Sequence, residues 1–430
     1  MVENVTGLIN ESVNELIVNW ETTVEKGSFT MATVLVLGGG YAGMRAIKFL
    51  QREVPSDDKI ILVDKTGTHA EKTNLHEVAA GTIAPERITY EINDVISSRV
   101  NFIQDTVTNV DVDQKQVTLK DHEPITYDYL VLALGFQTET FGLKGAEENA
   151  LPMDDLKTSE AVYRHIEDKV KGYAQTKDPN DLTVAVCGAG FTGIELLGEL
   201  TQSLPKLQTR YNTPEIKLVC LERSPAILPM FDKSLAEYAM RFMAKHDVEM
   251  KLGSNIKEIK PGAVVYTDGN DEEHEQLANT IVWTVGVSGS HVIADSGFDQ
   301  RRNRVVVKDD LSIEGHPEVY VVGDVAAVMD ADSDRPYPTT AQIALAAGAQ
   351  AAKNIGLQLR GHETRPFVYK SVGTVASLSD RDGIGEIFSN KRKVKGYPAS
   401  ALKKVITDRS ILESAHLGTV FSKGRFDLYH

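Results

Sequence analysis

The stretch "VLVLGGGYAGMRA", residues 34–46, decides the fold, because an apolar run meets a cluster of glycines there. The run at 34–37 predicts a buried strand, and the residues after Gly43 predict a helix. Between them lies Gly38-x-Gly40-x-x-Gly43, the spacing of a dinucleotide-binding turn, in which the backbone comes close to a pyrophosphate. One such motif is weak evidence, since glycine-rich turns also occur without a ligand.

A second copy of the pattern makes the evidence strong. Residues 183–200 read "TVAVCGAGFTGIELLGEL", and the same glycine spacing begins at Gly188. Each half closes with an apolar strand that ends in glycine, 97 residues on in one half (Gly38 to Gly135) and 98 in the other (Gly188 to Gly286). An internal repeat of this fidelity predicts two dinucleotide-binding domains.

Each turn is followed by a second strand that ends in a carboxylate. Asp64 stands 21 residues after Gly43, and Glu222 stands 29 residues after Gly193. A carboxylate at about this distance accepts hydrogen bonds from a ribose. We interpret "LPKLQTRYNTP", residues 204–214, as an inserted loop that lengthens the second spacing. Two dinucleotide sites in one chain suggest a flavin and a nicotinamide, because one passes hydride to the other.

A third element indicates which site holds the flavin. The strand "EVYVVGDVAA", residues 318–327, delivers Asp324 at its carboxyl end, where a carboxylate can bind ribityl hydroxyls. An aspartate that only caps a turn is the alternative. The next segment, residues 337–355, predicts a helix capped by Thr339 or Thr340. Such a helix aimed at a flavin ring would stabilise negative charge on it.

Composition and charge limit the classes of protein. The chain has 430 residues, 42% of them hydrophobic, and a net charge of −15, which argues against a nucleic-acid partner. Cys187 and Cys220 form neither a redox pair nor a zinc motif, so we predict two buried structural thiols in a reducing, cytosol-facing compartment. Residues 1–30 precede the first motif, and we interpret them as an N-terminal extension, either non-native or peripheral.

Six motifs together resemble one family: "VLGGGYAG", "LHEVAAGTI", "LVLALGFQTETFG", "CGAGFTGIELLGEL", "VYVVGDVAA" and "PTTAQIA". They are similar to type II NADH dehydrogenases, single-chain NADH:quinone oxidoreductases of respiratory membranes that pump no protons. The resemblance covers roughly residues 31 to 425. It implies an α/β fold of two tandem Rossmann-like domains. The implied parts are an FAD-binding domain at 31–150 and 300–375, an NADH-binding domain at 151–299, and a membrane-anchoring segment at 376–430.

The resemblance also implies the cofactor sites, with one FAD in each chain. The residues expected at FAD are Gly38, Gly39, Gly40, Tyr41, Ala42, Gly43, Asp64, Lys65, Val107, Asp324, Ala341 and Lys403. Those expected at NADH are Gly188, Gly190, Gly193 and Glu222. A carboxylate at Glu222 would repel a 2′-phosphate and so favours NADH over NADPH, although Arg223 beside it weakens that preference.

For catalysis, the resemblance points to Glu195 as an acidic residue that faces the flavin and couples it to quinone. A first-turn glutamate favoured by the helix dipole is the plain alternative. Gln342 matches a glutamine that lines the quinone slot. Many family members have polar residues where this chain has Ala346 and Ala347, so the choice between menaquinone and ubiquinone stays open. No second ligand is identified near His69 or His76, and we predict no metal site.

The carboxyl-terminal stretch differs in charge from the rest of the chain. Residues 388–430 carry six Lys and three Arg against Asp408, Glu413 and Asp427, a local charge of +6. Apolar residues alternate with these charges, among them Tyr397, Leu402, Val405, Ile406, Ile411 and Leu412. A solvated charged face is the plain alternative. The resemblance favours a peripheral anchor on an anionic membrane, on the cytoplasmic side of the cell membrane. A homodimer stays open.

The cysteines of the chain distinguish it from some related flavoenzymes. Disulfide reductases and sulfide:quinone reductases need redox cysteines beside the flavin, and neither cysteine of this chain fits. A soluble NADH oxidase or a ferredoxin–NAD(P) reductase-like enzyme remains the alternative, because the glycine motifs do not specify the electron acceptor. A flavin-binding redox sensor without turnover also remains.

Overall fold

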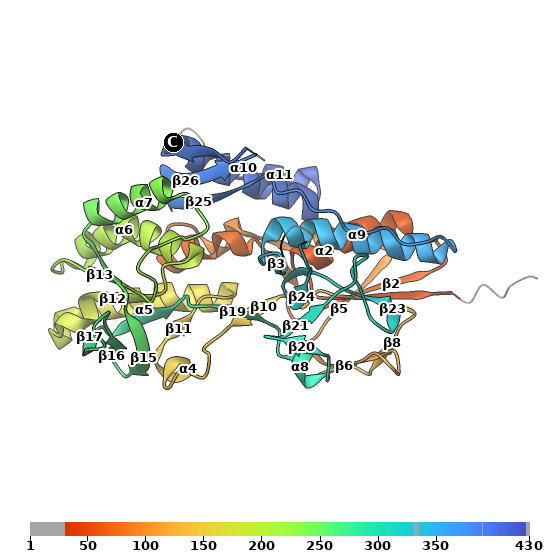
Figure 1. Ribbon diagram of the computed structural model, residues 1–430, viewed down its shortest axis with the longest axis horizontal. Coiled ribbons are helices and arrows are strands. Elements are labelled where there is room, and N and C mark those ends of the chain that lie inside the picture. Colours follow the sequence, from red (N-terminus) through yellow and green to blue (C-terminus); the bar gives the residue numbers. More distant parts are fainter. Residues whose placement is uncertain (1–30, 331–332, 334, 389, 427–430) are drawn as a thin grey trace, which may run out of the picture.

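The computed structural model describes residues 31–330, 333, 335–388 and 390–426. The predicted extension at 1–30 therefore lies outside the described residues. Two α/β domains lie side by side, and the carboxyl-terminal segment lies along one side of both (Figure 1).

The first domain is built on a six-stranded sheet with the order β22-β23-β9-β1-β2-β5. Its strands are β1 (Thr33–Leu37), β2 (Lys59–Asp64), β5 (Val100–Gln104), β9 (Tyr129–Leu132), β22 (Ser312–Ile313) and β23 (His316–Val321). All neighbours are parallel except β22 and β23. The helices α2 (Tyr41–Glu53) and α9 (Ala341–Leu359) cover one face (Figure 1). The opposite side carries the small sheet of β6 (Val107–Asp111), β7 (Gln116–Leu119) and β8 (Ile125–Thr126).

The second domain repeats this plan with a parallel five-stranded sheet in the order β11-β18-β12-β13-β14. Its strands are β11 (Leu151–Pro152), β12 (Thr183–Cys187), β13 (Lys217–Glu222), β14 (Val248–Leu252) and β18 (Thr280–Trp283). Its helices are α5 (Leu156–Thr176), α6 (Phe191–Tyr211) and α7 (Lys233–Lys245). A small antiparallel sheet holds β15 (Asn255–Lys260), β16 (Ala263–Thr267) and β17 (Glu273–Leu277). The structure thus confirms the repeat.

The chain crosses between the domains twice, at β10 (Phe136–Thr138) and β19 (Val287–Gly289), which pair with each other. The predicted boundaries after residues 150 and 299 lie beyond these crossings. Shorter elements are β3 (Thr68–Ala70), α3 (Leu75–Ala80), β4 (Thr89–Glu91), α4 (Ala146–Asn149), α8 (Val292–Asp295), β20 (Gln300–Arg301), β21 (Arg304–Val306) and β24 (Ala326–Ala327).

The predicted loop at 204–214 is wrong, because α6 continues to Tyr211 through Pro205. Proline removes one helical hydrogen bond and disfavours a helix interior. Here Leu204 and Leu207, which flank the proline, are both buried in the core of the second domain. Their burial favours the longer helix over a loop, and the extra turns account for the longer spacing to Glu222.

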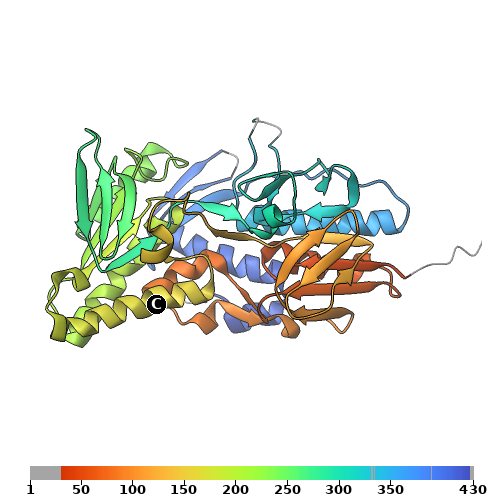
Figure 2. The same cartoon turned by 90° about the horizontal axis from the view of Figure 1, so that it is seen from below.

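The carboxyl-terminal unit consists of a three-stranded sheet and two helices. They are β25 (Gly373–Ser379), β26 (Asp382–Ile387), β27 (Arg392–Lys395), α10 (Tyr397–Ser414) and α11 (Leu417–Lys423). Seen from below, the helices of this unit lie in the middle of the molecule, between the two domains (Figure 2). None of the helices among the described residues is both long and apolar enough to cross a membrane.

The helix α10 turns a polar face towards the protein. Thr407 donates to the side chain of Asn74, Ser410 donates to Glu71, and Ser414 accepts from Tyr90. The opposite face exposes Val405 and Leu412, which the sequence placed on a membrane-facing side; Ile411, from the same predicted set, is instead buried. The helix is therefore polar inside and partly apolar outside, the reverse of an ordinary surface helix.

Close packing of α2 on α9 generates a testable prediction. A Cβ added to Gly348 would overlap the backbone carbonyl of Ala42, whereas one added to Gly172 in α5 would meet nothing within 4 Å. We expect Gly348→Ala to destabilise the protein by about 1–3 kcal/mol through overpacking. The control Gly172→Ala should stabilise it by up to about 1 kcal/mol. Thermal unfolding of both variants checks this, and equal melting temperatures would contradict the close packing.

Candidate active site

The first glycine turn has the geometry that a pyrophosphate requires. Gly38 adopts φ 103°, which L side chains rarely adopt, and a Cβ there would overlap the carbonyl oxygen of Ala133. Gly43 lies so close to the carbonyl oxygen of Gly38 that a side chain there would collide with it. By contrast, a Cβ on Gly40 would meet no atom within 4 Å, and no side chain caps the start of α2. The first amides of α2 are thus open to an anion.

The second turn has the same geometry. Gly188 adopts φ 104°, and a Cβ on Gly193 would overlap the carbonyl oxygen of Gly188. A Cβ on Gly190 would meet nothing within 4 Å, and the start of α6 likewise has no side-chain cap. Both turns therefore fit the diphosphate group of a dinucleotide.

The carboxylate that follows each turn holds the turn itself. An Oδ2 atom of Asp64 accepts a hydrogen bond from the amide of Gly39 at 2.6 Å. In the second domain, Oε2 of Glu222 accepts from the amide of Ala189 at 2.7 Å. The sequence predicted these carboxylates as ribose ligands and did not predict this second role. Each stabilises the turn because a charge-assisted hydrogen bond fixes its middle residue.

A cavity lies between the carboxyl end of β23 and the start of α9. It is lined by Arg304, Gly323, Asp324, Ala326, Val328, Tyr337, Pro338, Thr339, Thr340, Ile343 and Ala344. The predicted cap of α9 is confirmed, since Oγ1 of Thr340 accepts from the amide of Ile343 at 3.3 Å. Ala341 is the first residue of that helix. The cavity thus brings together a carboxylate, hydroxyls and a helix amino terminus, which are groups that would bind the ribityl hydroxyls of a flavin.

Asp324 lies among positive charges. Burial raises the pKa of Asp324, and the charges of Lys72 and Arg304 oppose that rise. Burial also lowers the pKa of Lys72, whose ammonium group lies 4.4 Å from the ring centre of Phe136. Lys72 is a charged neighbour of the flavin cavity that sequence reasoning missed, because nothing in the local pattern links it to a residue 252 positions away.

Other residues predicted at FAD have different neighbours in the structure. The hydroxyl of Tyr41 donates to Glu71 at 3.0 Å, and Ala42 is buried against α9. Lys65 is largely exposed and lies 3.6 Å from Asp155. Val107 is buried at the start of β6, three residues after β5 has ended at Gln104.

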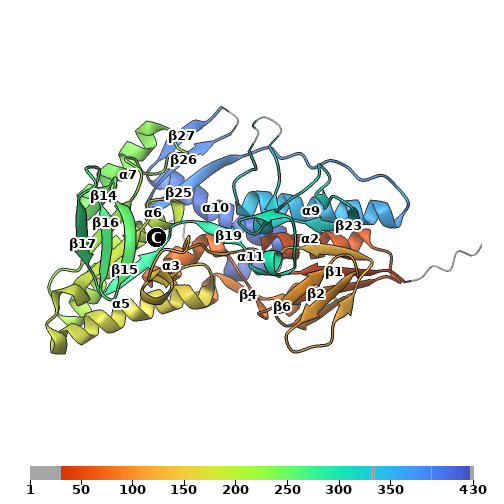
Figure 3. The same cartoon turned by 60° about the horizontal axis from the view of Figure 1, so that its bottom comes forward.

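Glu195 lies in a buried polar cluster. One of its oxygens, Oε1, accepts hydrogen bonds from Nζ of Lys403 at 2.5 Å, from the amide of Ser377 at 2.9 Å and from the Ser377 hydroxyl at 3.3 Å. The other oxygen, Oε2, lies 3.7 Å from Nδ1 of His76. These residues come from α6, α10, β25 and α3, and Figure 3 shows α10 beside β25 and α2. Lys403, predicted at FAD, thus lies beside the predicted catalytic carboxylate.

Charge within this cluster keeps Glu195 ionised. Burial by itself would raise the pKa of Glu195, but the positive charge of Lys403, the nearby His76 and the hydrogen bonds from Lys403 and Ser377 outweigh burial, so that its pKa is lowered. Burial lowers the pKa of His76, while the charge of Glu195 opposes that shift. His76 is largely neutral near neutral pH as a result.

The amide of Gln342, predicted at the quinone, is held by two neighbours. Its Nε2 donates to the carbonyl oxygen of Gly373, and its Oε1 accepts from the hydroxyl of Tyr369, both at 3.1 Å. Tyr369 in turn meets the ring of Tyr337 edge-on, with ring centres 5.5 Å apart. Gln342 is therefore held in one orientation beside aromatic rings.

The two cysteines are buried free thiols, as predicted. They lie on the neighbouring strands β12 and β13, and burial raises the pKa of the Cys187 thiol to about 12. A thiol with so high a pKa is a poor redox nucleophile. The structure thus supports the argument against cysteine-based flavoenzymes.

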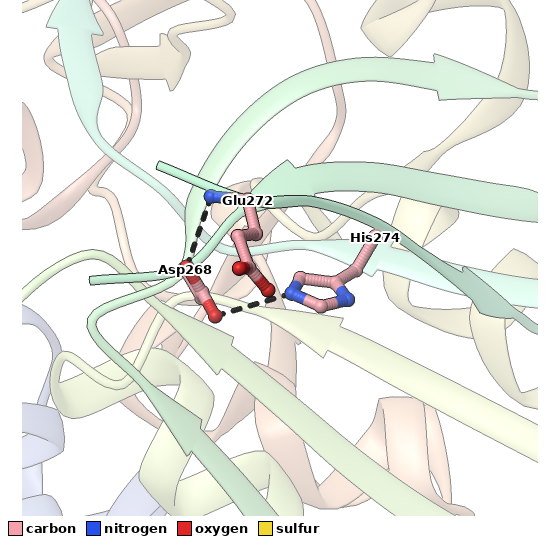
Figure 4. Close-up of side chains that lie close together, drawn as sticks. All are labelled: Asp268, Glu272 and His274. Carbon is pink, nitrogen blue, oxygen red and sulfur yellow. Dashed lines mark hydrogen bonds and ion pairs between the residues drawn. The ribbon is translucent and has the colours of Figure 1, made fainter. Parts of the chain in front are cut away.

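One group of three potential metal ligands occurs among the described residues. Asp268, Glu272 and His274 lie within 4.8 Å of one another at the tip of the β16–β17 hairpin (Figure 4). The carboxylate of Asp268 already accepts from the amides of Asn270 and Glu272 and contacts His274. This is the ordinary arrangement of an aspartate that caps a turn.

Comparisons with known proteins agree with this geometry. The sequence profile of the family described as "Pyridine nucleotide-disulphide oxidoreductase" matches residues 32–348, which defines the class of flavoenzyme fold. A "Type II NADH:quinone oxidoreductase" of Staphylococcus epidermidis is 42% identical over 400 residues, 91% of this chain and 98% of the relative. The protein of the same name from Staphylococcus aureus is 40% identical over the same shares of both chains. The chain belongs to the type II NADH:quinone oxidoreductase family, whose members oxidise NADH and reduce a quinone.

Solved structures confirm the fold. NDH2 from Plasmodium falciparum, in complex with NADH, superposes with a TM-score of 0.78 at 15% identity, covering 92% of this chain and all of that one. A sulfide:quinone oxidoreductase from Aquifex aeolicus gives 0.73 at 20% identity, covering 92% and 96%. The family relatives do not favour the soluble oxidase, ferredoxin reductase-like or sensor alternatives.

The open space at Gly40 and Gly190 generates a prediction about the two turns. Because a Cβ added to either glycine would meet no atom within 4 Å, alanine at either position should leave the fold intact and obstruct only a bound diphosphate. We expect Gly40→Ala to be purified with at least about tenfold less flavin, and Gly190→Ala to keep its flavin and bind NADH at least about tenfold more weakly, the cost of a lost charge-assisted contact. Flavin absorbance and NADH titration measure both. Equal flavin loss in the two variants would contradict the division of sites.

Proposed function

We propose that this chain binds FAD at the first glycine turn and NADH at the second, and passes the electrons to a membrane quinone. The single observation that carries this division is the cavity at Asp324 and the start of α9, whose Gly323 lies against Ala42 of the first motif. We propose the predicted division into an FAD-binding domain (31–150 and 300–375), an NADH-binding domain (151–299) and a carboxyl-terminal unit, with the two boundaries between the domains moved to the crossings at β10 and β19 and the unit beginning at β25.

In this proposal FAD supplies the hydride and electron chemistry, and the chain supplies position and charge. The open amides at Gly40 and Gly190 hold the two diphosphates. Asp324 binds the ribityl hydroxyls, while the amino terminus of α9 at Ala341 stabilises negative charge on the ring. Glu222 selects NADH, since its carboxylate would repel the 2′-phosphate of NADPH.

We propose that Glu195 couples the two half-reactions. Hydride transfer from NADH requires stacked rings and no proton from the protein. Reduction of the quinone to a quinol adds two electrons and two hydrogens; NADH supplies both electrons and one hydrogen as hydride, so titratable side chains must deliver one further proton. Glu195 is supported in this role by its burial, its ion pair with Lys403 and its place at the meeting point of both domains and the carboxyl-terminal unit. Gln342, fixed by Tyr369, is the proposed contact for the quinone headgroup.

Replacing Glu195 by glutamine tests this role. The substitution keeps the shape of the side chain and removes its charge and its proton. We expect flavin reduction by NADH, measured by stopped flow, to fall only slightly, and steady-state quinone turnover to fall by roughly ten- to a hundredfold. The structure places Glu195 beyond the first turn of α6, so if both rates stay unchanged, its role is only the structural one of the buried ion pair with Lys403. If flavin reduction alone collapses, the residue belongs to the NADH site.

We propose that the outer surface of α10 and α11 binds the membrane peripherally, on its cytoplasmic side. Large apolar side chains exposed there are Val405, Leu412, Leu417, Phe421 and Phe426. Not every positive charge of this stretch is available to lipid, because Lys403, Lys404 and Arg425 pair with Glu195, Asp380 and Glu77 inside the protein. Around β27, Lys393 pairs with Asp232 and Lys395 donates to the carbonyl oxygen of Ser234, whereas Lys391 and Arg392 are exposed and can meet anionic headgroups.

A paired substitution tests the membrane surface. We expect Leu417→Ser with Phe421→Ser to weaken sedimentation with anionic liposomes about tenfold or more, because each buried side chain contributes ~1.5–3 kcal/mol. Phe141→Ser removes an equally exposed aromatic ring far from α11 and should bind as the unmodified protein does. High salt should weaken binding of the unmodified protein. Unchanged binding of the paired variant would place the anchor elsewhere.

A further inference from the structure

The two oxygens of Glu195 have unequal surroundings. Oε1 accepts three hydrogen bonds, from Lys403 and from the amide and hydroxyl of Ser377. No described residue donates to Oε2, whose polar neighbour is Nδ1 of His76 at 3.7 Å, beyond hydrogen-bond distance. Both side chains are buried, with exposed fractions of 3% for His76 and 7% for Glu195. A further proton on Glu195 would therefore bind at Oε2, on the side of His76.

The Ser377 hydroxyl influences which nitrogen of neutral His76 carries the proton. Nδ1 is the nitrogen that faces Glu195. The hydroxyl lies 3.3 Å from Oε1 of Glu195 and 3.2 Å from Nε2 of His76. The hydroxyl has a single proton and can donate it to only one of these two acceptors. In the arrangement in which it donates to Oε1 of Glu195, Nε2 of His76 carries a proton and donates to Ser377. Neutral His76 thus presents a bare Nδ1 to Oε2, so that two lone pairs face each other across the gap.

Four charged groups act on His76 and set the charge in the gap. They are Glu195 on α6, Lys403 on α10, Glu77 on α3, and Arg425 after α11. Lys403 and Glu195 neutralise each other, and Arg425 donates two hydrogen bonds to Glu77 at 2.6 and 2.8 Å. Each ion pair is neutral overall. A negative charge added nearby would therefore be compensated by a proton that binds between Nδ1 of His76 and Oε2 of Glu195.

We propose that Nδ1 of His76 and Oε2 of Glu195 form a shared binding site for one proton that is delivered to the quinone. A proton from water enters the gap and forms an N–H or O–H bond there, when the electron pair from NADH adds negative charge to the neighbouring site. That bond breaks again when the proton moves to a quinone oxygen, while the electrons come from NADH. His76 acts through Glu195 and is a positioning residue. The proposal rests on the role of Glu195 proposed above.

Proton uptake on reduction tests the shared site directly. The FAD-loaded enzyme is reduced anaerobically by NADH in weakly buffered solution, and a pH indicator records the protons taken up. Hydride transfer itself takes no proton from water, so a decrease in uptake caused by a side-chain substitution reports protein groups. We expect His76→Gln and Glu195→Gln to lower the uptake by a similar amount. The control Ser379→Ala, on the same strand as Ser377, should match the unmodified enzyme.

The pH dependence of quinone turnover gives the second readout. In the reduced, unmodified enzyme the gap between His76 and Glu195 holds its proton less completely as pH rises. Quinone turnover should therefore fall towards alkaline pH. We expect His76→Gln to lose this alkaline fall and to turn over roughly tenfold more slowly at acid pH. Ser377→Ala keeps the hydrogen bond from the backbone amide of residue 377 to Glu195 but removes the hydroxyl that contacts Nε2 of His76. We therefore expect this variant to shift the pH at which quinone turnover falls.

The outcomes separate the inference from the proposed function. If Glu195→Gln lowers proton uptake and His76→Gln does not, His76 is no partner in the site and the inference is wrong. If Glu195→Gln changes neither uptake nor turnover, the proposed role of Glu195 is wrong. Should His76→Gln fail to hold FAD, an unshifted pH profile of Ser377→Ala would still overturn the shared site.

Discussion

The negative charge of the buried carboxylate Glu195 must be compensated, and its partners come from three separate elements of the fold. Ionised groups are costly inside a protein unless they are paired and hydrogen-bonded. Lys403 comes from the carboxyl-terminal helix α10, Ser377 from β25, and His76 from the segment that leaves the first domain. Docking of these three elements on α6 is thus tied to one charge. Loss of any partner would leave that charge less compensated.

The need of buried polar groups for hydrogen-bond partners also explains why the inner face of α10 is polar. The segment from Glu71 to Glu77 is rich in polar groups, and Ser410, Thr407 and Arg425 bind them. An apolar inner face would leave these groups without partners. The outer face is then free to carry apolar side chains, which suits a surface that meets lipid. The proposed membrane surface and the cluster around Glu195 consequently share one helix.

Much of the fold could be predicted from local sequence, because the signals are local. Both glycine turns, the strand that ends at Asp324, the cap at Thr340 and the buried thiol of Cys187 follow from short patterns and are found in the structure. The extension of α6 through Pro205 could not be predicted, because the burial of Leu204 and Leu207 in the core of the second domain outweighs the tendency of proline to end a helix.

The site was only partly predictable for a related reason. Glu195 and Lys403 are 208 positions apart, and nothing in either neighbourhood indicates that they pair. The same holds for His76, which sequence analysis considered only as a metal ligand. Tertiary packing also determines the pKa of Glu195, because partners from other elements, Lys403 above all, outweigh the effect of burial and lower it.

The most direct test of the account is the position of FAD in a crystal structure of the loaded enzyme. The account predicts the diphosphate on the amides at Gly40, the ribityl chain at Asp324, and the ring between the start of α9 and the Glu195–Lys403 pair. A diphosphate on the turn at Gly190, or a ring remote from Glu195, would contradict it.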